Sequence, residues 1–126
     1  MRSVVYDAGP LVAAERNERR FWAEHRVRLE LGIVPCVPSV IVAQVSRSPK
    51  QAQLRRLLRG CEVVPLDEEG AHRTGALLAK SGTSDIADAT LVSLALGRTA
   101  DIVTSDRADI EHLAACTRGR LRVVDT

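Results

Sequence analysis

Short apolar runs along the chain predict five buried strands. Residues 3–6 (SVVY) and 101–104 (DIVT) are the clearest, because brief apolar segments between polar residues are typical of strands inside a sheet. Three further runs carry the same pattern. The predicted strands are residues 3–6, 32–37, 62–65, 101–104 and 121–124.

Between these runs, apolar residues recur at helical spacing, and helix-starting and helix-ending residues mark the boundaries. Gly9 and Pro10 favour a helix start, Asn17 and Asp67 are good N-caps, and Gly97 offers a C-terminal stop. The predicted helices are residues 11–15, 18–31, 39–45, 50–59, 68–80, 86–96 and 108–115.

Residues 39–45 (SVIVAQV) fit two structures. Their β-branched side chains favour a strand, whereas Ser39 as an N-cap after Pro38 favours a helix. We expect a helix, partly because of the family resemblance described below.

The alternation of short strands with helices predicts an α/β fold. A short-stranded, mainly parallel central sheet should be flanked by helices in three layers. The 126 residues suffice for one core and contain no repeat, linker or low-complexity tract, so we expect a single domain over residues 1–126.

Composition narrows the possible functions. Aromatic residues make up only 2% of the chain, so the core is aliphatic and nucleic-acid binding by stacked aromatic side chains is disfavoured. The net charge of +2 implies no polyanionic partner by itself. Arginines are concentrated in residues 16–28 and 47–59. Those of residues 47–59 fit either contacts to RNA phosphates or a solvated helix face.

The three cysteines lack the spacing of a disulfide set or a zinc site. We therefore expect reduced thiols that pack as small apolar side chains. The N-terminal apolar run is too short for a signal peptide, and no apolar stretch is long enough to cross a membrane. These features predict a cytoplasmic protein.

Four aspartates are placed where an α/β fold gathers its chemistry. Asp7 and Asp106 each follow a predicted strand, and Asp85 and Asp88 lie three residues apart at the start of a nearly all-apolar helix. The carboxyl ends of parallel strands meet at one edge of a sheet, and ligands bind there. We expect the four carboxylates to share one pocket, where their mutual repulsion calls for a positive charge.

Each of these acids also has a plain structural explanation. Asp85 or Asp88 can favour a helix N-terminus, and Asp106 can cap the last helix. For any one acid alone, the structural explanation is as good as a functional role. For all of these acids together with Asp7, the structural explanation is much weaker. Asp109 is interpreted as a first-turn helix acid rather than a ligand.

The order of these motifs resembles the PIN-domain ribonucleases, and more narrowly the VapC-type toxins of bacterial toxin–antitoxin pairs. That pattern has an Asp ending the first strand, a Glu on an early helix, an Asp in a D-x-x-I-A-A-x-A helix and an Asp in a T-x-D strand end. Asp7 matches the first, Asp88 in DATLVSLA the third, and Asp106 after Thr104 the fourth. The resemblance extends over the whole chain.

The resemblance implies a metal-dependent endoribonuclease. Asp7, Asp88 and Asp106 would bind Mg²⁺ or Mn²⁺, which prefer oxygen ligands, with Asp85 as a supporting ligand or base. Thr104 would orient Asp106 or a water molecule through its hydroxyl. The resemblance also implies an RNA substrate, a cognate antitoxin and a homodimer.

One position departs from the family pattern. Gln44 stands where the resemblance places a Glu, so an amide oxygen remains but the negative charge is lost. Gln44 would then form a hydrogen-bonding wall of the site. Either Asp85 restores the missing charge or the activity is weakened.

Two other functional classes stay open at this point. A catalytically impaired PIN domain that binds RNA or a partner without cleaving is suggested by Gln44. A receiver-like signalling domain has similar length and an acidic Mg²⁺ pocket. Such a domain needs an Asp at the end of the third strand and a Lys after the fifth, but here Pro65 ends the third strand and no Lys follows Lys80. Nucleotide-binding enzymes are disfavoured because neither GxxxxGK[ST] nor GxGxxG occurs.

The remaining aromatic and histidine residues have less specific interpretations. Phe21 and Trp22 fit the core, or a dimer or antitoxin contact if they are exposed. His25, His72 and His112 lack metal-ligand spacing, and we expect them at surface or partly buried positions.

Overall fold

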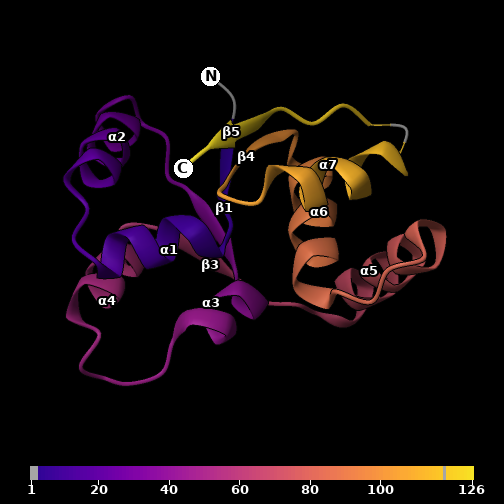
Figure 1. Ribbon diagram of the computed structural model, residues 1–126, viewed down its shortest axis with the longest axis horizontal. Helices are drawn as coiled ribbons and strands as arrows, with labels where there is room; N and C mark the ends of the chain where they lie inside the picture. Colours follow the sequence, from indigo (N-terminus) through magenta and orange to yellow (C-terminus); the bar gives the residue numbers. More distant parts are fainter. Residues whose placement is uncertain (1–2, 118) are drawn as a thin grey trace.

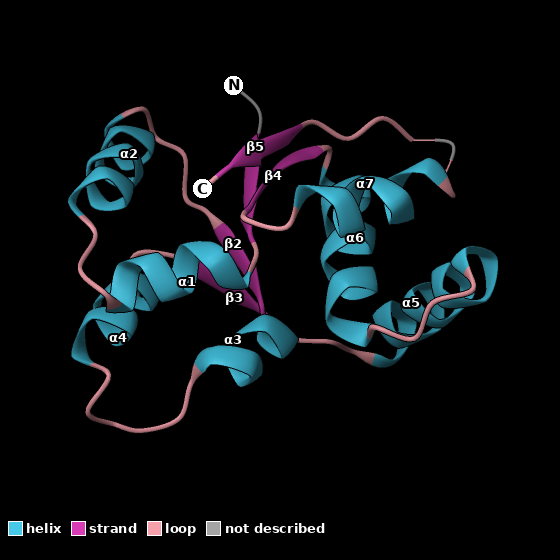
Figure 2. Cartoon of the chain, viewed as in Figure 1, coloured by secondary structure: helices cyan, strands magenta, loops and turns pink. Residues whose placement is uncertain are grey.

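The computed structural model describes residues 3–117 and 119–126. Within these residues the chain forms five strands and seven helices (Figures 1 and 2). In chain order they are β1 (Ser3–Tyr6), α1 (Ala8–Glu15), α2 (Arg19–Glu30), β2 (Cys36–Pro38), α3 (Ser39–Val45), α4 (Ala52–Arg59), β3 (Glu62–Val64), α5 (Glu68–Ser81), α6 (Ile86–Arg98), β4 (Ala100–Thr104), α7 (Arg107–Ala115) and β5 (Val123–Asp125).

All five strands are parallel and lie in the order β3-β2-β1-β4-β5. The longest pairing joins β1 to β4, from Ser3 opposite Ala100 to Tyr6 opposite Val103. Because the two strands end side by side, the residues that follow them emerge at the same edge of the sheet. The predicted α/β class with a parallel sheet is confirmed.

Helices cover both faces of the sheet. Figure 1 shows α1 to α4 on one side and α5 to α7 on the other. Strand β1 alternates accordingly, with Tyr6 buried in the core cluster shared with α1 to α4, and Val5 in the cluster shared with α5 to α7. Both clusters consist mainly of aliphatic side chains, as the low aromatic content predicted.

Helix α1 begins three residues earlier than predicted. Its N-cap is Asp7, whose side chain accepts a hydrogen bond from the Ala8 N–H, so Gly9 and Pro10 lie inside the first turn. The capping preference of Asp outweighs the glycine–proline signal here.

Two positive-φ residues other than glycine account for further differences. Helix α6 continues through Gly97 to Arg98, and Thr99, with φ of 53°, forms its left-handed cap. Asn17 has φ of 55° and turns the chain between α1 and α2, so that Glu18, not Asn17, precedes α2. Asparagine tolerates this conformation better than most residues, which explains its placement in the turn.

Helix α4 begins later than predicted because its upstream residues form a closed turn. The Gln51 side-chain oxygen accepts hydrogen bonds from the N–H groups of Arg47 and Ser48, and its amide donates to the Val45 carbonyl. The prediction that 39–45 is helical is confirmed by α3. Strands β2 and β5 are shorter than predicted and begin later.

The aromatic and histidine side chains of α2 form part of the core. Phe21 is 3% exposed, so its core interpretation is confirmed, and Trp22 is partly buried. His25 is also 3% exposed, and the expectation of a surface or partly buried position was wrong for it. The Tyr6 hydroxyl lies 2.8 Å from His25 Nδ1, a contact across 19 residues that no local pattern indicates. The same hydroxyl accepts a hydrogen bond from Arg28.

Cys36, Cys61 and Cys116 are free thiols, as predicted. Among the described helices, none combines the length and the apolar character needed to cross a bilayer.

Candidate active site

Asp7 is held in place at the end of β1. Its side chain is 5% exposed, and both carboxylate oxygens accept hydrogen bonds. Oδ1 accepts from the Ala8 N–H at 2.7 Å, and Oδ2 accepts from the Thr104 hydroxyl at 2.6 Å. Capping α1 and bonding to β4 leave this carboxylate little freedom to turn.

Thr104 connects two acids through one hydroxyl. The residue is fully buried at the end of β4, and while its hydroxyl donates to Asp7, it accepts the backbone N–H of Asp106 at 2.9 Å. The hydroxyl therefore fixes the turn that leaves β4 relative to Asp7. The hydroxyl thus contacts both Asp106 and Asp7, and the orienting role expected for Thr104 stays a prediction.

Asp85 and Asp88 lie at the N-terminus of α6. Asp85 is the N-cap, and its Oδ1 accepts the Asp88 N–H at 2.9 Å. Asp85 is exposed and Asp88 is partly buried. The cap fixes the first turn of α6 and with it the backbone of Asp88.

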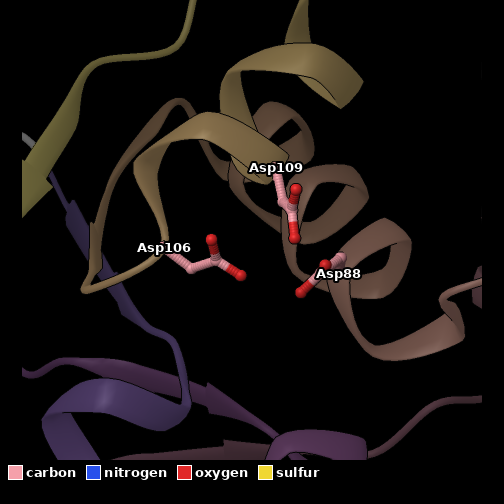
Figure 3. Close-up of side chains that lie close together, drawn as sticks. All are labelled: Asp88, Asp106 and Asp109. Carbon is pink, nitrogen blue, oxygen red and sulfur yellow. The ribbon is translucent and has the colours of Figure 1, made fainter.

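Asp88 forms a cluster with acids from the loop after β4 and from α7. One carboxylate oxygen from each of Asp88, Asp106 and Asp109 lies within 4.8 Å of the other two (Figure 3). The interpretation of Asp109 as only a first-turn helix acid missed this contact. The available signal was its position three residues after Asp106, the same spacing that links Asp85 to Asp88.

Crowding of negative charge changes the acidity of Asp88. Its pKa is raised to about 7, first by burial and then by repulsion from Asp85, Asp7, Asp106 and Asp109. Of the four predicted aspartates, Asp88 and Asp106 lie together in the cluster, whereas Asp7 and Asp85 lie outside it and act on Asp88 through their charge.

The pKa of Asp106 is raised too, by partial loss of solvent and then by the hydrogen bond to Asp109 and its charge. In this group, carboxylates are stabilised by a proton or by a cation.

The oxygen atoms fit a divalent ion. Mg²⁺ and Ca²⁺ bind oxygen at about 2.0 to 2.6 Å, so two oxygen ligands of one ion lie up to about 5 Å apart. The 4.8 Å limit among Asp88, Asp106 and Asp109 falls within that span. A set of carboxylate oxygens without sulfur or imidazole suits hard cations such as Mg²⁺ and Mn²⁺.

Gln44 lies on the exposed part of α3. This helix packs against α1 and α6, the two helices that begin beside Asp7 and Asp85. The placement of its amide on the wall of the site stays a prediction.

The PIN domain family matches residues 4–115, which include the whole acidic cluster. The chain belongs to the PIN-domain family. Members of this family are typically metal-dependent nucleases that bind Mg²⁺. The match excludes the receiver-like alternative. No curated protein sequence matches the chain.

Solved PIN-type structures share the fold at low sequence identity. A chain of the DNA-bound VapBC complex from Salmonella typhimurium matches with a TM-score of 0.68 and 20% identity, over 99% of this chain and 98% of that one. VapBC2 from Rickettsia felis, bound to a DNA fragment from its promoter, gives a TM-score of 0.67 and 16% identity, with 98% of each chain covered. A toxin–antitoxin complex from Klebsiella pneumoniae gives 0.66 and 17%, over 85% of this chain and 89% of that one.

Proposed function

We propose that this PIN domain is a metal-dependent endoribonuclease that acts as the toxin of a type II toxin–antitoxin system. The observation that carries the proposal is the carboxylate cluster at the carboxyl edge of the sheet in a chain matched by the PIN family over residues 4–115. Residues 1–126 would form the single catalytic domain.

The side chains divide the work of holding a metal ion. We assign Asp7, Asp88 and Asp106 as direct or water-mediated ligands of Mg²⁺ or Mn²⁺, and Asp85 as a supporting charge or base. When bound, such an ion polarises the scissile phosphate and lowers the pKa of a bound water. Thr104 keeps the Asp7 carboxylate and the Asp106 backbone in register through its two hydrogen bonds.

The relatives support an antitoxin among the proposed partners. The Klebsiella structure is a toxin–antitoxin complex, and the VapBC structures are bound to DNA. For this chain we propose an RNA substrate, a cognate antitoxin, a homodimer and a cytoplasmic location. An antitoxin Arg would suit the acidic cluster, because its planar fork meets carboxylates two at a time.

Gln44 favours a second candidate function. A site without the family's Glu can bind RNA or a partner and cleave slowly or not at all, because a neutral amide neither attracts a cation by charge nor accepts a proton from water.

Cleavage of a labelled RNA mixture by the purified chain separates the two candidates. We expect endonucleolytic products with Mg²⁺ or Mn²⁺, none with EDTA, and none from Asp88→Asn. RNA binding without products in either metal would support the non-cleaving alternative and contradict the ribonuclease.

A further inference from the structure

We propose that Asp109 supplies the fourth carboxylate of this site, in place of the acid that Gln44 lacks. The inference rests on the proposed metal-dependent function and concerns which side chains carry the charge. The negative charge would have moved from α3 to α7.

The first support is the position of the Asp109 carboxylate. It lies in the first turn of α7, and one of its oxygens is within 4.8 Å of oxygens from both Asp88 and Asp106. Figure 3 shows the three side chains pointing toward a common region from α6, the loop after β4 and α7. Asp109 therefore shares the space of two residues already assigned to the ion.

The second support is the different use of Asp85, the other acid that can replace the missing charge. As the N-cap of α6, Asp85 accepts the Asp88 N–H with one carboxylate oxygen. Asp85 also lies outside the group formed by Asp88, Asp106 and Asp109. Asp109 is not the N-cap of its helix, because Asp106 occupies that position in α7. Asp109 is therefore a better candidate than Asp85 for replacing the negative charge that is missing at position 44.

The third support is the balance of charge. With Asp109 in place of the missing Glu, the matched aspartates Asp7, Asp88 and Asp106 become a set of four acids, the number in the family pattern, and Asp85 is a further acid outside the group of three. A Glu at position 44 would add a further negative charge to a site in which oxygens of Asp88, Asp106 and Asp109 already lie within 4.8 Å of one another. When Asp109 is counted, a neutral Gln at position 44 leaves the number of acids matched to the family pattern at four.

Calorimetric titration of Mn²⁺ into the metal-free chain of residues 1–126 tests the exchange. We expect Asp109→Asn to weaken Mn²⁺ binding about tenfold or more, since even changes around metal ligands typically cost 10- to 100-fold. Adding Gln44→Glu to Asp109→Asn should recover at least half of that loss on a logarithmic scale. Glu111→Gln, an exposed acid on the same helix, is the matched control and should change binding less than about twofold.

A melting curve without metal gives an independent measurement. Asp109→Asn should raise the melting temperature of the metal-free protein, because it removes one of several crowded like charges. Glu111→Gln should not raise it, since this variant loses the ion pair with Arg107.

The outcomes separate this inference from the proposed function. If Asp88→Asn abolishes Mn²⁺ binding while Asp109→Asn leaves it unchanged, the metal site stands and the role of Asp109 is refuted. Loss of binding in Asp109→Asn without recovery by Gln44→Glu refutes the exchange with position 44. Unchanged binding in both single aspartate variants contradicts the inference and the proposed function together.

Discussion

At the scale of single residues, the Thr104 hydroxyl has the widest influence on the candidate site. It is the only side-chain group among the described residues that is bonded to both Asp7 and the Asp106 backbone. The residue is fully buried, away from bulk solvent. Loss of the hydroxyl therefore leaves a buried carboxylate oxygen and a backbone N–H without this partner.

Thr104→Val tests this role with little change in shape. We expect a loss of about 1–3 kcal/mol in the free energy of unfolding and Mn²⁺ binding about 10- to 100-fold weaker. Thr74→Val is the matched control, because Thr74 is also buried but its hydroxyl only faces that of Thr90 at 3.5 Å. Urea denaturation and calorimetry measure both quantities. Equal metal affinity in the two variants would show that Thr104 does not position the site.

Sequence reasoning at this scale identified the aspartates that follow strands, but it missed contacts across the fold. Asp7 and Asp106 could be found because strand ends are visible in the apolar pattern. Asp109 was discounted because the first-turn preference for acids already explained it. His25 was misplaced because its Tyr6 partner is distant in sequence and lies on a different element.

At the scale of elements, the close approach of α1 to the end of β4 shapes the site. A Cβ added to Gly9 would lie 2.9 Å from the Ser105 Cβ and 3.1 Å from its backbone nitrogen, and closer still to its hydroxyl oxygen. Ser105 stands between Thr104 and Asp106, so any displacement reaches the cluster. Glycine at this helical position is required by the packing rather than by its backbone angles.

Gly9→Ala should therefore disturb both stability and metal binding. We expect a loss of about 1–3 kcal/mol, the usual cost of overpacking, together with weaker Mn²⁺ binding. Gly75→Ala, in α5 with open space around it, is the control and should stabilise the protein by about 0.5–1 kcal/mol. A stabilising Gly9→Ala with normal Mn²⁺ affinity would contradict the packing argument.

The sequence predicted the order and type of all the described elements, while their ends followed from cap chemistry and tertiary contacts. The start of α5 and both ends of β1 were right because Asp67 and the SVVY run are unambiguous. The end of α6 was missed because Thr99, a β-branched residue, rarely adopts positive φ. The start of α4 was missed because the hydrogen bonds of Gln51 depend on the loop around it.

At the scale of the whole molecule, two groups give opposite dependences of stability on pH. Asp88 holds its proton more tightly when folded, with a pKa raised to about 7, so stability falls as the pH rises from about 4 to 7. His25, whose pKa burial lowers to about 4, resists protonation when folded, so stability falls as the pH drops from about 6.5 to 4. The two effects oppose each other between about pH 4 and 6.5.

Urea denaturation of the metal-free protein from pH 4 to 8 tests this opposition. We expect a shallow profile for the unmodified chain up to about pH 6.5. Asp88→Asn should instead gain stability relative to the unmodified chain as the pH rises, because the Asp88 effect is removed while the His25 effect remains. At pH 7.5 Asp88→Asn should exceed the unmodified chain by about 1–2 kcal/mol, after discounting for the partial exposure of Asp88. Parallel profiles for the two proteins would show that Asp88 is not strained by its neighbours.

The central claim is that the acids at the carboxyl edge of the sheet hold a divalent metal ion. The most direct measurement is the anomalous scattering of crystals of the protein grown with Mn²⁺. We predict an anomalous peak for a manganese ion that is bonded to oxygens of Asp88 and Asp106, with Asp7 and Asp109 as direct or water-mediated ligands. Full-occupancy manganese elsewhere with none in this cluster, or well-ordered carboxylates without manganese at saturating concentration, would contradict the account.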